Sequence, residues 1–174
     1  MKKILSLFAI VGLFTFSGCS DDDNVVEPEY DTISTVFDIK NVSFAYNATD
    51  GYNIYQEFGQ VLFPEDVVLI YRQSGTLSGS NIPIWQQIPR TLYTGQGELD
   101  YDFDFSDEDF TIYAGGNYNL SLTPQYLNNQ TFRIVIVPGS LSGSAKSVNK
   151  PDYSDYNAVI KRYNIDDSIV KQLN

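Results

Sequence analysis

Residues 99–105, LDYDFDF, carry the clearest structural pattern in the chain. Apolar and acidic side chains alternate along this stretch with the two-residue period of a β-strand. One face of the strand is therefore expected to lie in a core and the other in solvent. The expected core side comprises Leu99, Tyr101, Phe103 and Phe105.

Two other segments, 66–72 (DVVLIYR) and 132–137 (FRIVIV), are almost entirely apolar. A short apolar run of this kind is typical of a central strand that is covered on both faces. Residues 74–80 (SGTLSGS), which follow the first of these segments, are small and polar and are expected to form a flexible loop.

Residues 36–46 and 52–58 predict the two strands of a hairpin around a turn at residues 47–51 (NATDG). The alternation in the first strand slips near Asn41, which indicates a bulge or a change of face. Further along the chain, residues 110–114 (FTIYA) and the short segment 118–122 (YNLSL) are also expected to be strands.

Pro83 and Pro89 flank a segment that contains Trp85. Because proline lacks a backbone N–H group, this segment is expected to be a short edge strand or a bulged one. Trp85 and the tyrosines could form a platform that stacks on sugar rings. The alternative is that these rings pack in the core or pair across strands.

The hydrophobic period changes near the C-terminus, where residues 153–163 predict a helix capped by Asp152. Asp166 or Asp167 is expected to cap a final turn. The chain is thus predicted to be all-β, an antiparallel β-sandwich of about seven or eight strands with a short C-terminal helix, and a small barrel is the alternative. The apolar helix face comprises Tyr156, Val159, Ile160 and Tyr163.

Composition excludes several kinds of chemistry. The 174 residues contain no histidine, which rules out Ser-His-Asp and Cys-His nucleophile systems and histidine-containing zinc or iron sites. Cys19 is the only cysteine, so no disulfide forms within one chain. Only carboxylate, lysine, tyrosine or serine chemistry could support an enzyme, and we expect no cofactor.

The N-terminus has the layout of a secretory signal peptide. Lys2 and Lys3 precede an apolar run over residues 4–16, and small residues follow. This run of about 13 residues is shorter than the roughly 20 that a membrane-spanning helix needs.

Residues 16–19 (FSGC) resemble the lipobox of bacterial lipoproteins, although Phe16 stands where leucine is usual. The resemblance implies that Cys19 becomes the mature N-terminus and is lipidated. Two or three acyl chains at this residue would anchor the protein stably. Residues 20–23 (SDDD) resemble the signal that sends lipoproteins of the Bacteroidota to the outer face of the outer membrane. A plain acidic tether is the alternative interpretation.

Charge restricts the partners. The formal charge is −11, and removal of residues 1–18 takes away two lysines and no acid. Such a surface repels nucleic acid and anionic lipid, so we expect membrane contact through the lipid alone and no nucleic-acid partner. The expected organisation is a signal peptide over residues 1–18, a lipidated acidic tether over 19–35 and one domain over 36–174.

The densest acidic group lies within residues 100–109, and its alternate aspartates are similar to the opening of an EF-hand loop. However, Phe105 replaces the obligatory glycine of that loop, and Thr111 replaces its terminal glutamate. A calcium site of another kind remains an alternative to a solvated face that keeps an exposed strand from pairing. Its candidate ligands are Asp100, Asp102, Asp104, Asp107 and Asp109.

Two other chemistries leave weaker signals. Glycoside hydrolysis needs two carboxyl groups about 5–10 Å apart, but no spacing selects a pair from the available glutamates. The triplets 31–33 (DTI) and 167–169 (DSI) resemble the O-glycosylation signal of Bacteroidota envelope proteins, which implies Thr32 and Ser168 as attachment sites. The glutamates are Glu57, Glu65, Glu98 and Glu108.

The chain as a whole resembles the small surface lipoproteins of unknown function in Flavobacteria and other Bacteroidota. The resemblance rests on residues 16–23 and, more loosely, on the order of segments 85–89, 132–138 and 155–163. It implies a lipid-anchored outer-membrane protein that faces the cell exterior. We expect a non-enzymatic binding or structural accessory module for an envelope protein or glycan. The alternative is a carboxylate-based glycan-acting enzyme or a carbohydrate-binding module.

Overall fold

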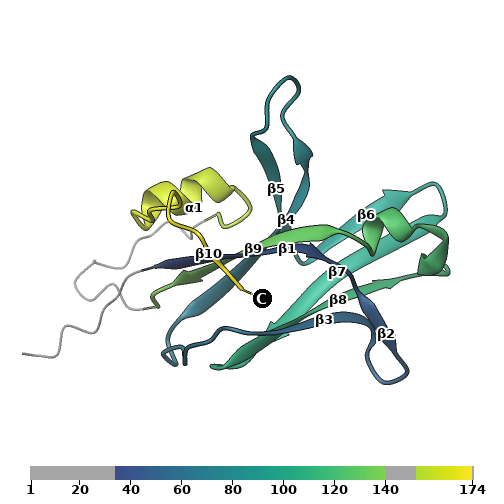
Figure 1. Cartoon of the computed structure of the whole chain (residues 1–174), viewed down its shortest axis with the longest axis horizontal. Helices are drawn as coiled ribbons and strands as arrows, with labels where there is room; N and C mark the ends of the chain where they lie inside the picture. Colours follow the sequence, from purple (N-terminus) through teal and green to yellow (C-terminus); the bar gives the residue numbers. More distant parts are fainter. Residues whose placement is uncertain (1–33, 140–151, 174) are drawn as a thin grey trace, which may run out of the picture. The chain divides into compact units, whose positions relative to one another are not determined.

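The computed structural model describes residues 34–139 and 152–173. Ten strands in this part of the chain form two five-stranded sheets, and one short α-helix lies between the last two strands in the sequence (Figure 1). Buried side chains from both sheets pack into a common core. The β-sandwich with a C-terminal helix that the sequence predicts is therefore confirmed.

We call the two sheets A and B. Along the chain, groups of strands belong alternately to sheet A and to sheet B. Neighbouring strands of sheet A are antiparallel, except that β10 runs parallel to β1. The two apolar segments expected to be central strands are indeed interior, as β9 and β4. In spatial order, sheet A comprises β10 (Lys171–Gln172), β1 (Thr35–Val42), β9 (Gln130–Val137), β4 (Val67–Thr76) and β5 (Pro83–Ile88).

Sheet B is antiparallel throughout. The expected hairpin around residues 47–51 forms its β2–β3 edge. The strand with the alternating aspartates, β7, lies between β8 and β6, and β6 is a strand that the sequence did not predict. In spatial order, sheet B comprises β2 (Ala45–Asn47), β3 (Gly51–Glu57), β8 (Asp109–Gly116), β7 (Gly97–Phe105) and β6 (Arg90–Thr94).

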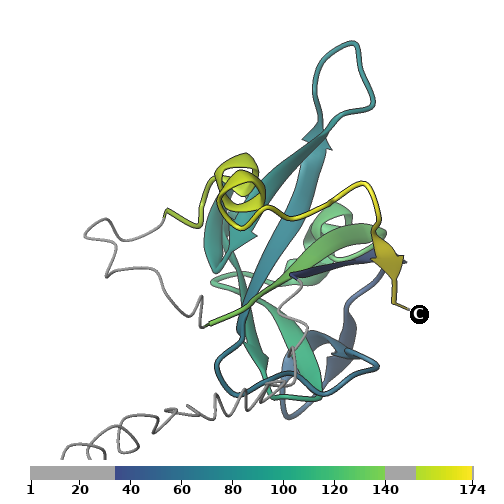
Figure 2. The same cartoon turned by 90° about the vertical axis from the view of Figure 1, so that its left-hand side faces the viewer.

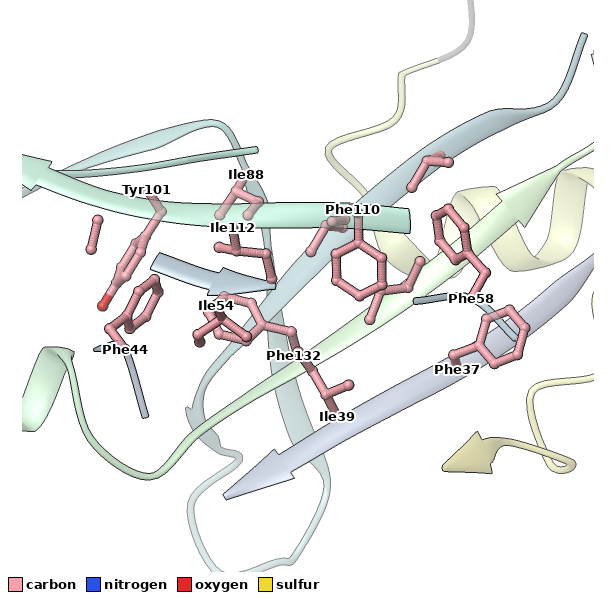
Figure 3. Packing of buried hydrophobic residues seen from close by; sticks show 14 of the residues in the cluster. Phe37, Ile39, Phe44, Ile54, Phe58, Ile88, Tyr101, Phe110, Ile112 and Phe132 are labelled. Carbon is pink, nitrogen blue, oxygen red and sulfur yellow. The ribbon is translucent and has the colours of Figure 1, made fainter. Parts of the chain in front are cut away.

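The core between the sheets is rich in aromatic rings. Figure 3 shows Tyr101 and Phe44 together at one end of it and Phe37 and Phe58 at the other. Tyr101 and Phe44 have ring centroids 5.8 Å apart, and both lie close to Phe132 of β9. Aromatic pairs at such distances contribute about 0.5–1.5 kcal/mol beyond the area they bury.

A second apolar cluster covers the outer face of sheet A. Helix α1 (Tyr156–Arg162) lies beside sheet A (Figure 2). Its Tyr156 and Val159 pack against side chains of β1, β4 and β9. The predicted apolar face of the helix is thus confirmed, but the helix is shorter than expected. Its N-cap is Asp155, which accepts a hydrogen bond of 3.2 Å from the backbone N–H of Ala158, whereas Asp152 accepts from the Ser154 N–H in the preceding turn.

The slip in alternation near Asn41 marks the place where the chain leaves sheet A. Asn41 has φ 57°, and the register between β1 and β9 shifts there. After this bulge, the N–H of Phe44 donates to the carbonyl of Leu127, and β2 begins in sheet B. The bulge and the change of sheet are therefore one feature.

The expected strand within residues 118–122 is wrong. Asn119 accepts a hydrogen bond from the backbone N–H of Ser121 and so caps a 3₁₀ turn, η1 (Leu120–Leu122). A second turn, η2 (Pro124–Tyr126), follows at once because proline suits the first position of a helical turn. Buried Leu120 and Leu127 fix these turns against the core.

Two other predictions need correction. Ser74–Thr76 is not loop but the end of β4, which pairs with β5 in a hairpin that extends beyond the rest of sheet A (Figures 1 and 2). Phe105 does not reach the core, because it lies at the end of β7 and is 46% exposed. The edge position expected for the Trp85 strand, β5, is confirmed.

Candidate functional site

The predicted acidic residues of β7 point away from the core. Asp100, Asp102 and Asp104 are exposed and lie opposite Gly115, Tyr113 and Thr111 of β8. Alternate residues of one strand are about 7 Å apart along its axis, whereas calcium ligands lie about 2.3–2.6 Å from the ion. The three carboxylates therefore form a row along the strand and do not converge on a point.

Tyrosines and backbone groups hold several of these acids. Tyr113 donates to Asp104 over 2.9 Å and Tyr55 donates to Asp109 over 3.0 Å. Asp102 accepts from the N–H of Phe103. Within residues 34–139 and 152–173, no group of three or more acidic or cysteine residues is placed to hold a metal ion. The arrangement favours a solvated sheet face.

Of the predicted lipid-attachment and glycosylation residues, only Ser168 lies in the described part of the chain. Cys19 and Thr32 fall outside the described residues. Ser168 is exposed in a turn, where its hydroxyl and its N–H both donate to Asp166, the residue that caps the final turn. No helix in the described part of the chain is long and apolar enough to cross a membrane.

The glutamates considered for glycan chemistry lie on the surface, and the tryptophan is partly covered. All four candidate glutamates are exposed: Glu57 and Glu98 on strands, and Glu65 and Glu108 in turns. The ring of Trp85 is only partly exposed, because the guanidinium of Arg133 lies over it at 4.6 Å from the ring centroid. Trp85 therefore packs under other side chains and does not present a free platform.

The most connected polar group of the described chain is centred on Arg133 of β9. Its Nε and Nη2 donate to the two carboxylate oxygens of Asp38 over 2.7 and 3.0 Å. Its Nη1 donates to the Tyr156 hydroxyl of α1 over 2.8 Å, and this hydroxyl donates to Asp167 over 2.7 Å. The arrangement ties the C-terminal segment to the outer face of sheet A. We call it the Arg133 clamp.

The charges of the clamp are closely matched. Asp38 is 2% exposed, and Lys40 approaches its second oxygen at 3.4 Å. Burial acts to lower the pKa of Arg133, but hydrogen bonds with Asp38 and Tyr156 raise this pKa above its ordinary value. Burial also raises the pKa of Tyr156, as does its hydrogen bond to Asp167. Arg133 thus stays charged and the Tyr156 hydroxyl stays protonated.

A second arginine, Arg72, lies in the core instead of under the helix. It is the last inward-facing residue of β4 after Val68 and Ile70, and it is only 8% exposed. Its Nε donates to Oε1 of Gln130 over 2.8 Å. Gln130 is itself buried, and its Nε2 donates to the carbonyls of Gln125 and Asn128.

Aromatic rings surround the Arg72 guanidinium. Its Cζ lies 5.0 Å from the centroid of the Tyr101 ring and 5.9 Å from that of Tyr126. Burial raises the pKa of Tyr101 to about 12, against the nearby charge of Arg72, which lowers it. The Tyr101 hydroxyl remains protonated at neutral pH and donates to the Tyr126 carbonyl over 2.6 Å.

No carboxylate of the described residues lies within 4.0 Å of Arg72. Moving a cation out of water costs several kcal/mol unless it is paired, and cation–π contacts return about 0.5–2 kcal/mol each. The charge of Arg72 is therefore only partly compensated by the described residues. We call Arg72, Gln130, Tyr101 and Tyr126 together the Arg72 end of the sandwich.

Neither arginine was identified as a functional candidate from the sequence. Both were present in segments recognised as buried strands, DVVLIYR and FRIVIV. A charged residue inside an otherwise apolar buried strand needs a partner or a ligand, since unpaired buried charge is costly. That signal could have singled them out, but only the fold tells which of the two has a carboxylate beside it.

Comparison with known proteins adds no relative: no family model, no curated protein and no solved structure matches the chain.

Proposed function

We propose that this protein is a lipoprotein anchored through Cys19 in the bacterial outer membrane, with its β-sandwich facing the cell exterior as a non-enzymatic binding or accessory module. The observation that carries the proposal is the sequence FSGC at residues 16–19, preceded by an apolar run and followed by SDDD. It supplies the attachment residue and a hydrophilic exit from the lipid surface.

The tether fits this placement. Between Cys19 and the first strand at Thr35 the sequence is mostly polar and acidic. A chain of about 15 residues spans at most about 50 Å when fully extended. The sandwich would stand clear of the lipid headgroups, and its negative charge would keep it from lying on an anionic bilayer.

A binding role accounts better than catalysis for the side chains of the sandwich. The candidate acids lie on exposed strand faces and in turns, where water screens them. The buried ionisable groups of the described residues are instead Asp38, whose carboxylate Arg133 binds, Arg72 and three tyrosines. These groups recognise or support a partner more readily than they transfer protons at neutral pH.

Lipid attachment is tested by growing cells that express the protein with an alkyne-bearing fatty acid and detecting the label on the purified chain. The wild-type protein should be labelled, and Cys19→Ser should lose the label and remain in the unprocessed form. Label retained on Cys19→Ser, or none on the wild type, would refute the anchor.

Exposure at the cell surface is tested separately. Protease added to intact cells should digest the sandwich, while a periplasmic marker protein survives. Survival of the sandwich in intact cells, with digestion only after lysis, would place it on the inner side of the outer membrane.

A further inference from the structure

The Arg72 end contains a buried positive charge, although the protein as a whole carries a large net negative charge. The formal charge is −11, yet the described acids leave Arg72 without a carboxylate, whereas Arg133 binds one through two hydrogen bonds. Sequence composition therefore does not explain the lack of a partner. The fold brings an acid to one arginine and none to the other.

Arg72 retains donors for an external group. Its hydrogen bond to Gln130 uses only Nε, so a hydrogen bond to the Tyr101 hydroxyl comes from an Nη atom and further Nη N–H groups remain. In the described part of the chain, every fully enclosed side-chain nitrogen or oxygen has a hydrogen-bond partner. An Nη atom that the Tyr101 hydroxyl does not engage must therefore reach the surface, consistent with the 8% exposure of the residue.

The surroundings hold the guanidinium in place. Gln130 fixes Nε and is itself fixed by two backbone carbonyls, while Tyr101 and Tyr126 contact the guanidinium with their rings. A pre-organised arginine loses little rotamer entropy when it binds. Tyr126 and Gln125 come from η2, so this turn forms the rim of the site.

We propose that Arg72 binds a carboxylate group at this end of the sandwich. A guanidinium offers paired N–H groups that match the two oxygens of a carboxylate in one plane. One positive charge balances one carboxylate, whereas a doubly charged phosphate would meet stronger repulsion from the acidic surface. The proposal deepens the binding role given above and is independent of the lipid anchor.

The experiment measures thermal unfolding of the purified protein in sodium acetate, with sodium chloride at equal ionic strength as the reference. Acetate should raise Tm by about 3–6 °C at ten times its Kd. Two further arms give the source of the carboxylate: sodium glucuronate stands for a sugar acid, and N-acetylglycine for the end of a peptide chain. The tighter of these two shows which source the site prefers.

Two variants assign the effect to the fork of Arg72. Arg72→Lys keeps the charge but loses the paired donors, so the Kd for acetate should rise at least tenfold while circular dichroism shows an unchanged fold. Arg90→Lys, on exposed β6, is the matched control and should bind as the wild type does. Equal effects of acetate and chloride on the wild type, or unchanged binding in Arg72→Lys, would overturn the proposal.

Should Arg72→Lys fail to fold, the wild type alone remains decisive. The wild-type protein is treated with a guanidinium-specific reagent, with and without acetate, and the modified arginines are identified by peptide mapping. Acetate should slow the modification of Arg72 and leave the modification of Arg90 unchanged. Equal protection of both residues, or of neither, would contradict the proposal. A failure of the fatty-acid label would concern the anchor only and leave these results unaffected.

Discussion

Arg133 and Arg72 occupy equivalent kinds of position and differ in what the fold places beside them. Each lies on an interior strand of sheet A, and each has a tyrosine ring against its guanidinium. Arg133 points outward and binds Asp38, whereas Arg72 points into the core and binds the neutral amide of Gln130. A charge in a buried strand therefore stabilises the structure in one case and remains available in the other.

The difference follows from strand pairing. Asp38 of β1 and Arg133 of β9 are directly opposite each other, so their side chains share one face of the sheet. Arg72 is opposite Phe132 of β9 and Gln86 of β5, and neither of these residues carries a charge. The comparison predicts that breaking the Arg133 site costs more stability than breaking the Arg72 site. It also predicts that an added anion binds at Arg72 and not at Arg133.

The largest effect should come from the clamp. Asp38→Ala leaves the mostly buried Arg133 with only the more distant carboxylate of Asp167, at 3.8 Å, and removal of one partner of a buried pair costs about 3–5 kcal/mol. Urea unfolding monitored by tyrosine and tryptophan fluorescence measures the loss. Asp102→Ala on the exposed face of sheet B is the control and should change stability by less than about 0.5 kcal/mol. Equal losses in the two variants would show that Asp38 does no more than an exposed acid.

The stability that Tyr101 contributes at the Arg72 end should decrease at alkaline pH. The pKa of Tyr101 is about 12 in the folded chain and 10.0 ordinarily, so between these pH values only the unfolded chain gives up the phenol proton. The stabilisation that Tyr101 provides is complete below pH 10 and falls as pH rises, by about 1.4 kcal/mol per unit.

Tyr101→Phe tests this pH dependence. Buried Tyr71 and Tyr156 also have raised pKa values and contribute to the total slope, so the comparison of interest is between wild type and variant. Urea unfolding at several pH values should show a shallower decline above pH 10 in Tyr101→Phe and parallel curves below it. Parallel curves over the whole range would mean that Tyr101 ionises equally in both states.

Removal of Arg72 should cost less than removal of Asp38. Arg72→Met takes away a partly compensated charge and fills a similar volume, and the remaining cost is the acceptor of Gln130 left without its donor, about 1–2 kcal/mol. Urea unfolding alongside Asp38→Ala gives the ranking directly. A loss as large as that of Asp38→Ala would identify Arg72 as a second structural clamp.

The smallest effect concerns the link to the helix. Tyr156→Phe removes the hydroxyl between Arg133 and Asp167 but keeps the ring against Tyr71 and Trp85, so about 1 kcal/mol should be lost. Hydrogen exchange should show faster opening of α1 with little change in β9. Uniform faster exchange in both elements would show that the helix and sheet open as one unit.

Much of the sandwich was predictable because its strands obey simple periods. The alternation in LDYDFDF and the apolar runs of β4 and β9 each specify a face or a depth, and the structure confirms them except at Phe105. The predictions failed where local hydrogen bonds or pairing between distant segments determine the structure. Asn119 and Pro124 turn a stretch with strand-like residues into 3₁₀ turns, and the short β10 depends on a parallel pairing with β1 from far along the chain.

The two arginine sites were beyond the reach of the sequence for a related reason. Asp38 and Arg133 are far apart in the chain, and their pairing depends on the register of β1 against β9. The partners of Arg72 come from β7, β9 and η2, so no spacing along the sequence reveals them. The acidic row of β7, which does stand out in the sequence, forms an exposed face.

The most direct test is an NMR titration of the arginine side-chain Nε–H signals with sodium acetate. Both Nε atoms are hydrogen-bonded, Arg72 to Gln130 and Arg133 to Asp38, which favours sharp and observable signals. The account predicts that the Arg72 signal shifts and saturates as acetate is added, while the Arg133 signal stays in place. An unmoved Arg72 signal, or equal shifts of both, would contradict it.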